Sequence, residues 1–125
     1  MSTVVPEVWE RMISSANRGD VWLADLEPVE GHEQGGTRPC LVLSDDLFNH
    51  GPAGLVVVLP LTSRGRGIQI RVLLDPPEGG VKVRSYIMPE MIRSISTRRL
   101  RTRWGMVGPT TLAAVEKNVK VLLGI

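Results

Sequence analysis

The chain has 125 residues, the usual length of one domain, with 22% charged and 42% hydrophobic residues. This composition is typical of a soluble globular domain and excludes a membrane-spanning helix, because no apolar run approaches the roughly 20 residues needed. The single cysteine, Cys40, excludes an internal disulfide bond and fits a reducing compartment, so we expect a cytoplasmic protein. One cysteine and two histidines also argue against a structural zinc site, and we expect no metal and no cofactor.

The net charge of +2 conceals an acidic half and a basic half. Residues 1–60 contain three arginines and nine acidic residues, a net charge of −6, whereas residues 61–125 contain twelve basic and four acidic residues, a net charge of +8. A basic half predicts a polyanionic partner. The alternative, which the sequence leaves open, is that Arg98, Arg99, Arg101 and Arg103 are only a solvated edge.

In chain order, the hydrophobic pattern predicts one helix, a series of strands and a closing helix. These are a short helix at about 6–15, strands at 20–26, 39–43, 55–61, 68–72, 81–88, 91–95 and 104–107, and a helix that begins at 108–111 and ends at Leu123. The strands at 39–43 and 55–61 are mostly aliphatic, which is typical of buried strands. In 68–72, apolar and polar side chains alternate, which is typical of a strand with one face exposed to solvent. Many short strands followed by a helix predict a mainly β, α+β fold built as a small, strongly bent β-barrel.

The last helix carries an apolar stripe, which we expect to pack on the barrel. The stripe consists of Leu112, Val115, Val119 and Leu122. We also expect Trp22, Trp104 and Cys40 to lie in the core, and His50, near a turn, to be structural.

The segment 31–44 combines a glycine-rich polar loop with the start of an apolar strand. It brings Arg38 to that start, where Pro39 favours an extended backbone. A guanidinium group matches the oxygens of a phosphate with two parallel hydrogen bonds. The strand at 55–61 ends in a Thr-Ser-Arg sequence at 62–64, so hydroxyl groups meet the guanidinium group if the two strands are neighbours. The alternative for Arg38 is a structural pair with a carboxylate such as Asp25 or Glu33.

Four segments together resemble the MazF/PemK/Kid family of toxin endoribonucleases. They are Arg18–Leu26, Gly36–Pro39, Pro60–Ser63 and Ile92–Ile95. Their order and spacing also match, over residues 18–125. The resemblance implies an SH3-like, PemK-type barrel with a C-terminal helix, so we expect a toxin domain at 18–125 preceded by an extension at 1–17.

The same resemblance implies the toxin of a type II toxin–antitoxin pair, a sequence-specific endoribonuclease that needs no metal ion. Such an enzyme cuts single-stranded RNA, chiefly mRNA, by attack of the 2′-hydroxyl, leaves 2′,3′-cyclic phosphate and 5′-hydroxyl ends, and blocks translation. It implies a homodimer and an antitoxin protein with an acidic C-terminal segment. One alternative is a non-enzymatic toxin of the same fold that binds a protein target such as DNA gyrase. A peptide-binding adaptor would need an aromatic-lined groove, which so few aromatic residues do not predict.

Arg38 and Thr62 occupy the positions of the catalytic pair that the resemblance implies. Glu33 matches an acidic loop position of the family, and Glu90 falls where some relatives have an aspartate linked to acid–base chemistry. Either glutamate becomes a general base if burial raises the pKa of its carboxyl group. The alternative for both is a solvated surface carboxylate.

We expect the RNA to contact a set of polar and basic side chains near this pair. They are His32, Gln34, Thr37, Ser63, Arg64, Arg66, Arg71, Lys82 and Arg84. Proteins that bind single-stranded RNA usually stack bases on aromatic side chains. Because aromatic residues are scarce here, we expect base recognition to rely on polar loop groups and the backbone.

Overall fold

The computed structural model describes residues 16–27, 31–32 and 35–125, so the predicted helix at 6–15 lies outside the described residues, as do Glu33 and Gln34. The chain order is β1 (Asp20–Asp25), β2 (Thr37–Val42), α2 (Asp46–Asn49), β3 (Leu55–Thr62), β4 (Val72–Leu74), η1 (Glu78–Gly80), β5 (Ser85–Ile87), η2 (Pro89–Met91), β6 (Arg93–Ser96), η3 (Thr97–Arg99), β7 (Leu100–Met106) and α3 (Pro109–Leu123). The three η elements are single turns of 3-10 helix.

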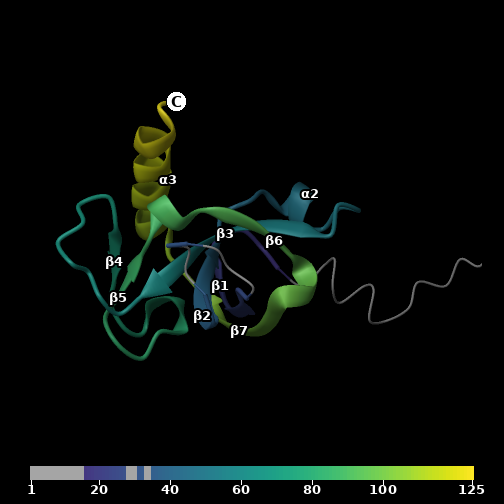
Figure 1. Ribbon diagram of the computed structural model, residues 1–125, viewed down its shortest axis with the longest axis horizontal. Helices are drawn as coiled ribbons and strands as arrows, with labels where there is room; N and C mark the ends of the chain where they lie inside the picture. Colours follow the sequence, from purple (N-terminus) through teal and green to yellow (C-terminus); the bar gives the residue numbers. More distant parts are fainter. Residues whose placement is uncertain (1–15, 28–30, 33–34) are drawn as a thin grey trace, which may run out of the picture.

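All described strands belong to one antiparallel sheet whose order is β4-β5-β3-β2-β1-β7, with β6 paired to the first half of β3. The long strand β3 therefore has three neighbours: β2, β6 and, at its end, β5. The sheet curls into a half-barrel, and α3 stands at the side of β4 and β5 (Figure 1). The predicted mainly β fold with a C-terminal helix is confirmed.

The central strands are apolar on both faces because each face meets a separate hydrophobic cluster. One cluster contains Val21, Leu41, Leu59, Leu61, Leu74, Val81, Ile87, Val107, Val115 and Val119. The other contains Ala16, Trp22, Ala24, Leu26, Cys40, Val42, Val56, Val58 and Ile95. Successive side chains of a strand point to opposite faces, so β1, β2 and β3 contribute alternate residues to the two clusters. This confirms the prediction that Trp22 and Cys40 are core residues.

Helix α3 covers the first cluster with only part of the predicted stripe. Val115 and Val119 are buried and Leu112 packs against the same cluster, whereas Leu122 is 40% exposed. The prediction for Leu122 is wrong because the last turns of α3 extend beyond the sheet (Figure 1). No helix of the described part of the chain is long and apolar enough to cross a membrane.

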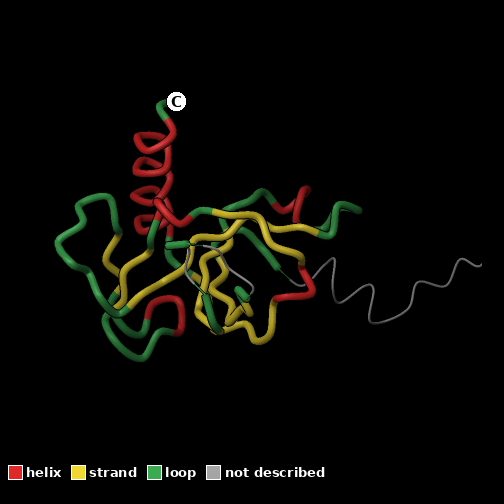
Figure 2. The backbone as a smooth tube through the Cα atoms, viewed as in Figure 1, coloured by secondary structure: helices red, strands yellow, loops and turns green. Residues whose placement is uncertain are grey.

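The strand predicted at 68–72 is wrong, and every other predicted strand differs from the structure by one or more residues at an end. The predicted strand at 68–72 is instead the end of a loop over 63–71 (Figure 2), because the backbone N–H groups of Ile68 and Arg71 close turns on the carbonyls of Gly65 and Ile68, at 3.3 and 3.2 Å, and β4 begins only at Val72. The predicted strand at 81–88 is reduced to Ser85–Ile87, and the one at 91–95 begins at Arg93 after a 3-10 turn. The last strand is longer than predicted, Leu100–Met106.

The two glycines of η1 let this turn approach the backbone of β7 closely. Gly80 has a φ of 76°, and a Cβ atom there would lie 2.2 Å from the carbonyl oxygen of Trp104. A Cβ atom on Gly105 would lie 3.0 Å from the carbonyl carbon of Gly79. Because Gly80 and Gly105 have no side chain, the backbones of η1 and β7 can pack directly against each other.

We expect Gly80→Ala to lower the free energy of unfolding by roughly 3 kcal/mol, because the new methyl group adds a steric clash to an unfavourable left-handed backbone. Gly54→Ala is the matched control, since Gly54 also has a positive φ, 68°, but no atom within 4 Å of the added Cβ. We expect about 1 kcal/mol from the control. Urea unfolding followed by circular dichroism measures both, and equal losses would contradict the contact.

Candidate active site

Arg38 lies at the beginning of β2, where the glycine-rich loop joins the sheet. Gly36 closes the base of that loop: its carbonyl accepts from Leu26 N at 2.9 Å, and its N–H donates to Glu27 Oε1 at 2.7 Å. The Nε of Arg38 donates to the carbonyl of Gly35 at 2.9 Å. This bond fixes the guanidinium group at the loop exit and leaves both terminal nitrogens without a hydrogen bond to any described residue.

Thr62 lies at the end of β3, beside Arg38. Strands β2 and β3 are antiparallel with Cys40 opposite Pro60, and the same register continued by two residues brings Arg38 opposite Thr62. The condition that the sequence analysis left open, that these two strands are neighbours, is thus met. The Thr62 hydroxyl oxygen accepts from Arg64 N at 3.2 Å, which leaves the hydroxyl hydrogen available to a ligand.

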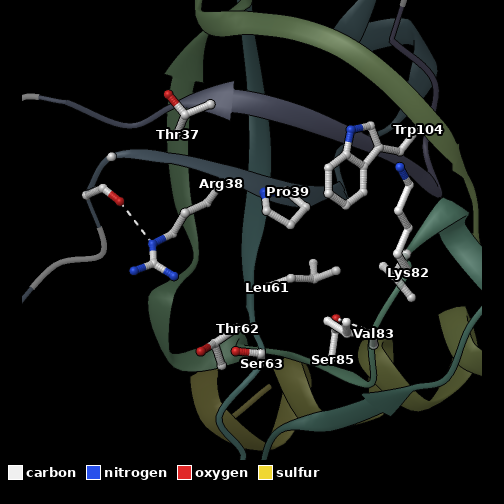
Figure 3. Close-up of a pocket in the computed structure, with 13 residues that line it drawn as sticks. Thr37, Arg38, Pro39, Leu61, Thr62, Ser63, Lys82, Val83, Ser85 and Trp104 are labelled. Atoms are coloured by element: carbon white, nitrogen blue, oxygen red, sulfur yellow. Dashed lines mark hydrogen bonds between the residues drawn. The ribbon is translucent and has the colours of Figure 1, made fainter.

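Both side chains line one pocket of about 480 Å³ (Figure 3). Its lining consists of Gly35, Gly36, Thr37, Arg38, Pro39, Leu61, Thr62, Ser63, Val81, Lys82, Val83, Ser85 and Trp104. The pocket thus joins the loop exit, the end of β3 and the segment before β5. Among the candidates from the sequence, it brings together Thr37, Arg38, Thr62, Ser63 and Lys82.

The pocket is cationic. Arg38 and Lys82 are its charged residues, and no carboxylate and no histidine occurs among the described lining residues. Such a site favours an anion, and paired guanidinium nitrogens and hydroxyl groups are common ligands of phosphate oxygens. Nowhere in the described ranges do three or more histidine, cysteine, aspartate or glutamate side chains form a group that could hold a metal ion.

The other basic candidates do not line this pocket. Arg71 is almost buried, with 7% of its side chain exposed, and its Nε donates to Glu90 Oε2 at 2.7 Å. Its Nη1 also donates to the carbonyls of Arg64 and Gly65, at 2.8 and 3.2 Å, so Arg71 shapes the loop after β3. The side chains of Arg64 and Arg66 belong to that loop and are exposed.

Arg84 and His32 lie at the surface, outside the pocket lining. Arg84 pairs with Asp75 at 2.9 Å, and this hydrogen bond and its charge raise the pKa of the guanidinium group above its usual value. His32 is exposed in a turn of the glycine-rich loop. His50, the histidine that was predicted to be structural, has its Nε2 2.8 Å from the carbonyl oxygen of Ala16.

Three arginines of the run between 98 and 103 bind β1 and the residues after it. Arg99 donates to the carbonyls of Asp25 and Glu27, and Arg101 pairs with Asp25 at 3.4 Å. Arg103 pairs with Asp20, a carboxylate only 2% exposed, at 3.2 Å. These contacts hold the edge of the sheet, so the three side chains are more than a solvated edge, while the side chains of Arg101 and Arg103 stay 52% and 46% exposed.

Trp104 is the pocket residue that the sequence analysis missed. It was predicted in the core, but 38% of it is exposed and it lines the pocket beside Lys82. The exposure of Trp104 was indicated by the basic residues that precede it, because a run of charged residues is typical of an exposed edge strand. The apolar pattern of residues 104–107 obscured this signal.

Known proteins resemble the chain in sequence and in structure. Residues 17–123 match the family described as PemK-like, MazF-like toxin of type II toxin-antitoxin system. The chain is 34% identical over 113 residues to Endoribonuclease MazF9 of Mycobacterium tuberculosis, covering 86% of this chain and 96% of the relative. It is 32% identical over 109 residues to Endoribonuclease EndoA of Bacillus subtilis, covering 86% and 94%.

Two solved structures from Deinococcus radiodurans share the fold. MazF from this organism has a TM-score of 0.79 at 33% identity, covering 88% of this chain and 97% of the other. A MazE-MazF structure has a TM-score of 0.72 at 33% identity, covering 88% and 96%.

We expect Cys40 to be unreactive in the folded protein. Burial raises the pKa of its thiol from 9.0 to about 12, although Arg93 and Arg38 act in the opposite direction. The reactive thiolate is then scarce at about pH 8. Iodoacetamide labelling followed by mass spectrometry should show no modification of native protein and one per chain after unfolding in guanidinium chloride. Rapid labelling of the native protein would contradict the burial.

Proposed function

This chain belongs to the PemK-like, MazF-like toxin family of type II toxin–antitoxin systems, and on that basis we propose that it is an endoribonuclease that cuts single-stranded RNA at specific sequences. The observation that carries the proposal is that Arg38 and Thr62 line one cationic pocket. Two relatives with about a third of their residues identical are named endoribonucleases. Cleavage of mRNA by such an enzyme would block translation.

The proposed reaction uses a nucleophile that the RNA supplies itself. The 2′-oxygen attacks the adjacent phosphorus, the bond from phosphorus to the 5′-oxygen breaks, and the products carry a 2′,3′-cyclic phosphate and a 5′-hydroxyl. The protein has to stabilise charge on the phosphoryl oxygens, accept the 2′-hydroxyl proton and let a proton reach the leaving oxygen. None of these tasks requires a metal ion.

Arg38 stabilises the charge that develops on the phosphate. Its two terminal nitrogens donate to the phosphoryl oxygens, while its Nε stays bonded to Gly35. A preorganised donor that is aimed at developing charge acts mainly in the transition state. The high pKa of a guanidinium group makes it a poor base, so charge stabilisation is its role.

Hydroxyl groups and the lysine complete the phosphate contacts. The Thr62 hydroxyl donates to a non-bridging oxygen, because its own oxygen already accepts from the backbone N–H of Arg64. Ser63 and Thr37 line the same pocket and contact the sugar–phosphate backbone. Lys82 neutralises a neighbouring phosphate, and this contact makes RNA binding weaken as salt rises.

Glu33 is the proton acceptor that we propose. It precedes Gly35, which lines the pocket, by two residues, whereas Glu90 is paired with Arg71 outside the pocket lining. Glu33 accepts the 2′-hydroxyl proton, and solvent supplies the proton of the leaving oxygen. His32 and Gln34, in the same loop, contact the RNA bases.

The antitoxin competes for the same surface. A MazE-MazF structure from Deinococcus radiodurans shares the fold of this chain, and an endoribonuclease from a mycobacterial species of the same fold has been solved in complex with its cognate antitoxin. We propose that the partner of this chain is a protein with an acidic C-terminal segment, because acidic side chains complement Arg38 and Lys82 as phosphates do. We also propose that the toxin is a homodimer, which doubles the cationic surface. A toxin that only binds a protein target would not need the pairing of Arg38 with Thr62.

We expect pure protein to cut a long RNA in the presence of EDTA and to leave 2′,3′-cyclic phosphate and 5′-hydroxyl ends. Mapping of the fragment ends tests the activity, the end chemistry and the cut sequence together. Arg38→Ala should lower kcat/KM at least about 100-fold, because a main source of charge stabilisation is lost. Its thermal unfolding and sedimentation should match the wild type.

Two outcomes would contradict this proposal. Cleavage by a well-folded Arg38→Ala variant at the wild-type rate would exclude the charge-stabilising role of Arg38. Loss of cleavage in EDTA that Mg²⁺ restores would place the protein in a different class of nuclease.

The two candidate bases are separated by matched substitutions. Glu33→Gln should lower kcat about 100-fold or more, the usual effect of removing a general base. Glu90→Gln keeps an oxygen that can accept from Arg71, so we expect kcat to change less than about threefold, with some loss of stability. Single-turnover cleavage and urea unfolding measure both variants, and the reverse order of kcat losses would identify Glu90 as the base.

A further inference from the structure

The pocket has two chemically different sides. Arg38, Thr62 and Ser63 form a polar side, whereas Trp104 lies on the other side next to Pro39 (Figure 3). Leu61 and Val83 extend the apolar lining near Trp104. A phosphate satisfies only the polar side. The apolar side is left to a flat, uncharged group joined to that phosphate.

The position of Trp104 results from a bulge in the edge strand. Val21 is opposite Gly105 and Trp22 is opposite Arg103, so Trp104 is an additional residue with no partner on β1. Bulges redirect side chains and often occur beside functional sites. Here the neighbouring Arg103 binds Asp20, while the indole ring of Trp104 lies in the pocket lining.

The turn η1 also packs closely against the backbone of Trp104. Gly80 approaches so closely that an added Cβ would lie 2.2 Å from the Trp104 carbonyl oxygen. The indole ring is therefore a partly exposed aromatic face on a fixed strand rather than a surface side chain of a flexible loop. A rigid aromatic residue loses little entropy when it binds a flat ligand.

We propose that Trp104 is the stacking platform for a nucleobase next to the scissile phosphate, with Lys82 contacting the phosphate of the same nucleotide. This inference rests on the proposed ribonuclease function and adds to it a specificity-determining residue. Stacking on an aromatic ring is worth a factor of about 5 to 150 in affinity for one base. Trp104 is the one aromatic residue among the described residues that line this pocket, so it supplies the aromatic contact there.

The test is a thermodynamic cycle between Trp104 and each base of the RNA. A short RNA that contains the mapped cut site carries a 2′-deoxy sugar at the scissile nucleotide, which prevents cleavage. In a series of such RNAs, one base at a time is replaced by an abasic residue. Wild-type affinity should fall about 5- to 150-fold at one position next to the cut.

Trp104→Ala should bind the intact RNA more weakly than the wild type by the same factor. Its affinity should not fall further when the abasic residue is at that one position. With an abasic residue at any other position, its affinity should fall by the same factor as that of the wild type. Trp104→Phe should keep most of the effect, because it retains an aromatic face. Phe48→Ala is the matched control: Phe48 is an aromatic residue 40% exposed on α2, which follows the opposite end of β2.

Two results for Trp104→Ala would overturn the proposal: it binds intact RNA as tightly as the wild type, or its loss of affinity is additive with every abasic position. Additive losses together with a changed oligomeric state in sedimentation would make Trp104 a subunit contact. Binding of RNA without cleavage by the wild type would refute the ribonuclease function, and the abasic series on the bound RNA would still test stacking on Trp104. The absence of RNA binding would refute both.

Discussion

The antiparallel register between β2 and β3 is the constraint on which the candidate site depends. A shift by one residue would move Leu41 into the cluster that contains Cys40 and Val42, and would move those two residues into the cluster that contains Leu41, where their side-chain volumes differ. The same register brings the beginning of β2 and the end of β3 to one edge of the sheet. Because Cys40 is opposite Pro60, the register continued by two residues makes Arg38 and Thr62 adjacent.

The charges of the chain divide into those that hold the fold and those left for a ligand. Arg71 is paired with Glu90, and Arg103 with Asp20. In contrast, the terminal nitrogens of Arg38 have no bond to the described residues, and Lys82 faces a pocket whose described lining has no carboxylate. The net charge of the basic half thus overstates the surface available to a polyanion, because part of it neutralises the acidic half.

Close backbone contacts give the pocket its second side. A glycine pair in η1 lies against β7, and the bulge in β7 leaves Trp104 unpaired on the edge strand. These contacts join β7 to the segment before β5, and both line the pocket together with the loop exit before β2 and the end of β3. The polar side fits a phosphate and the apolar side fits a base, which together make a nucleotide a suitable ligand.

The sequence by itself determined the class of fold, because periodic apolar runs and turn residues are local signals, and it carried the family resemblance, which is confirmed. It left the meeting of Arg38 with Thr62 conditional on two strands being neighbours, and only the structure supplied that pairing of β2 with β3. The sequence also determined the burial of Cys40 and Trp22. Only the tertiary structure decided which arginines are engaged, since partners such as Arg71 and Glu90 are distant in the chain. The tertiary structure also decided that Trp104 lines the pocket. The bulge in β7 and its contact with the glycines of η1 depend on how β7 packs against β1 and η1, and the hydrophobic pattern of the sequence does not predict this packing.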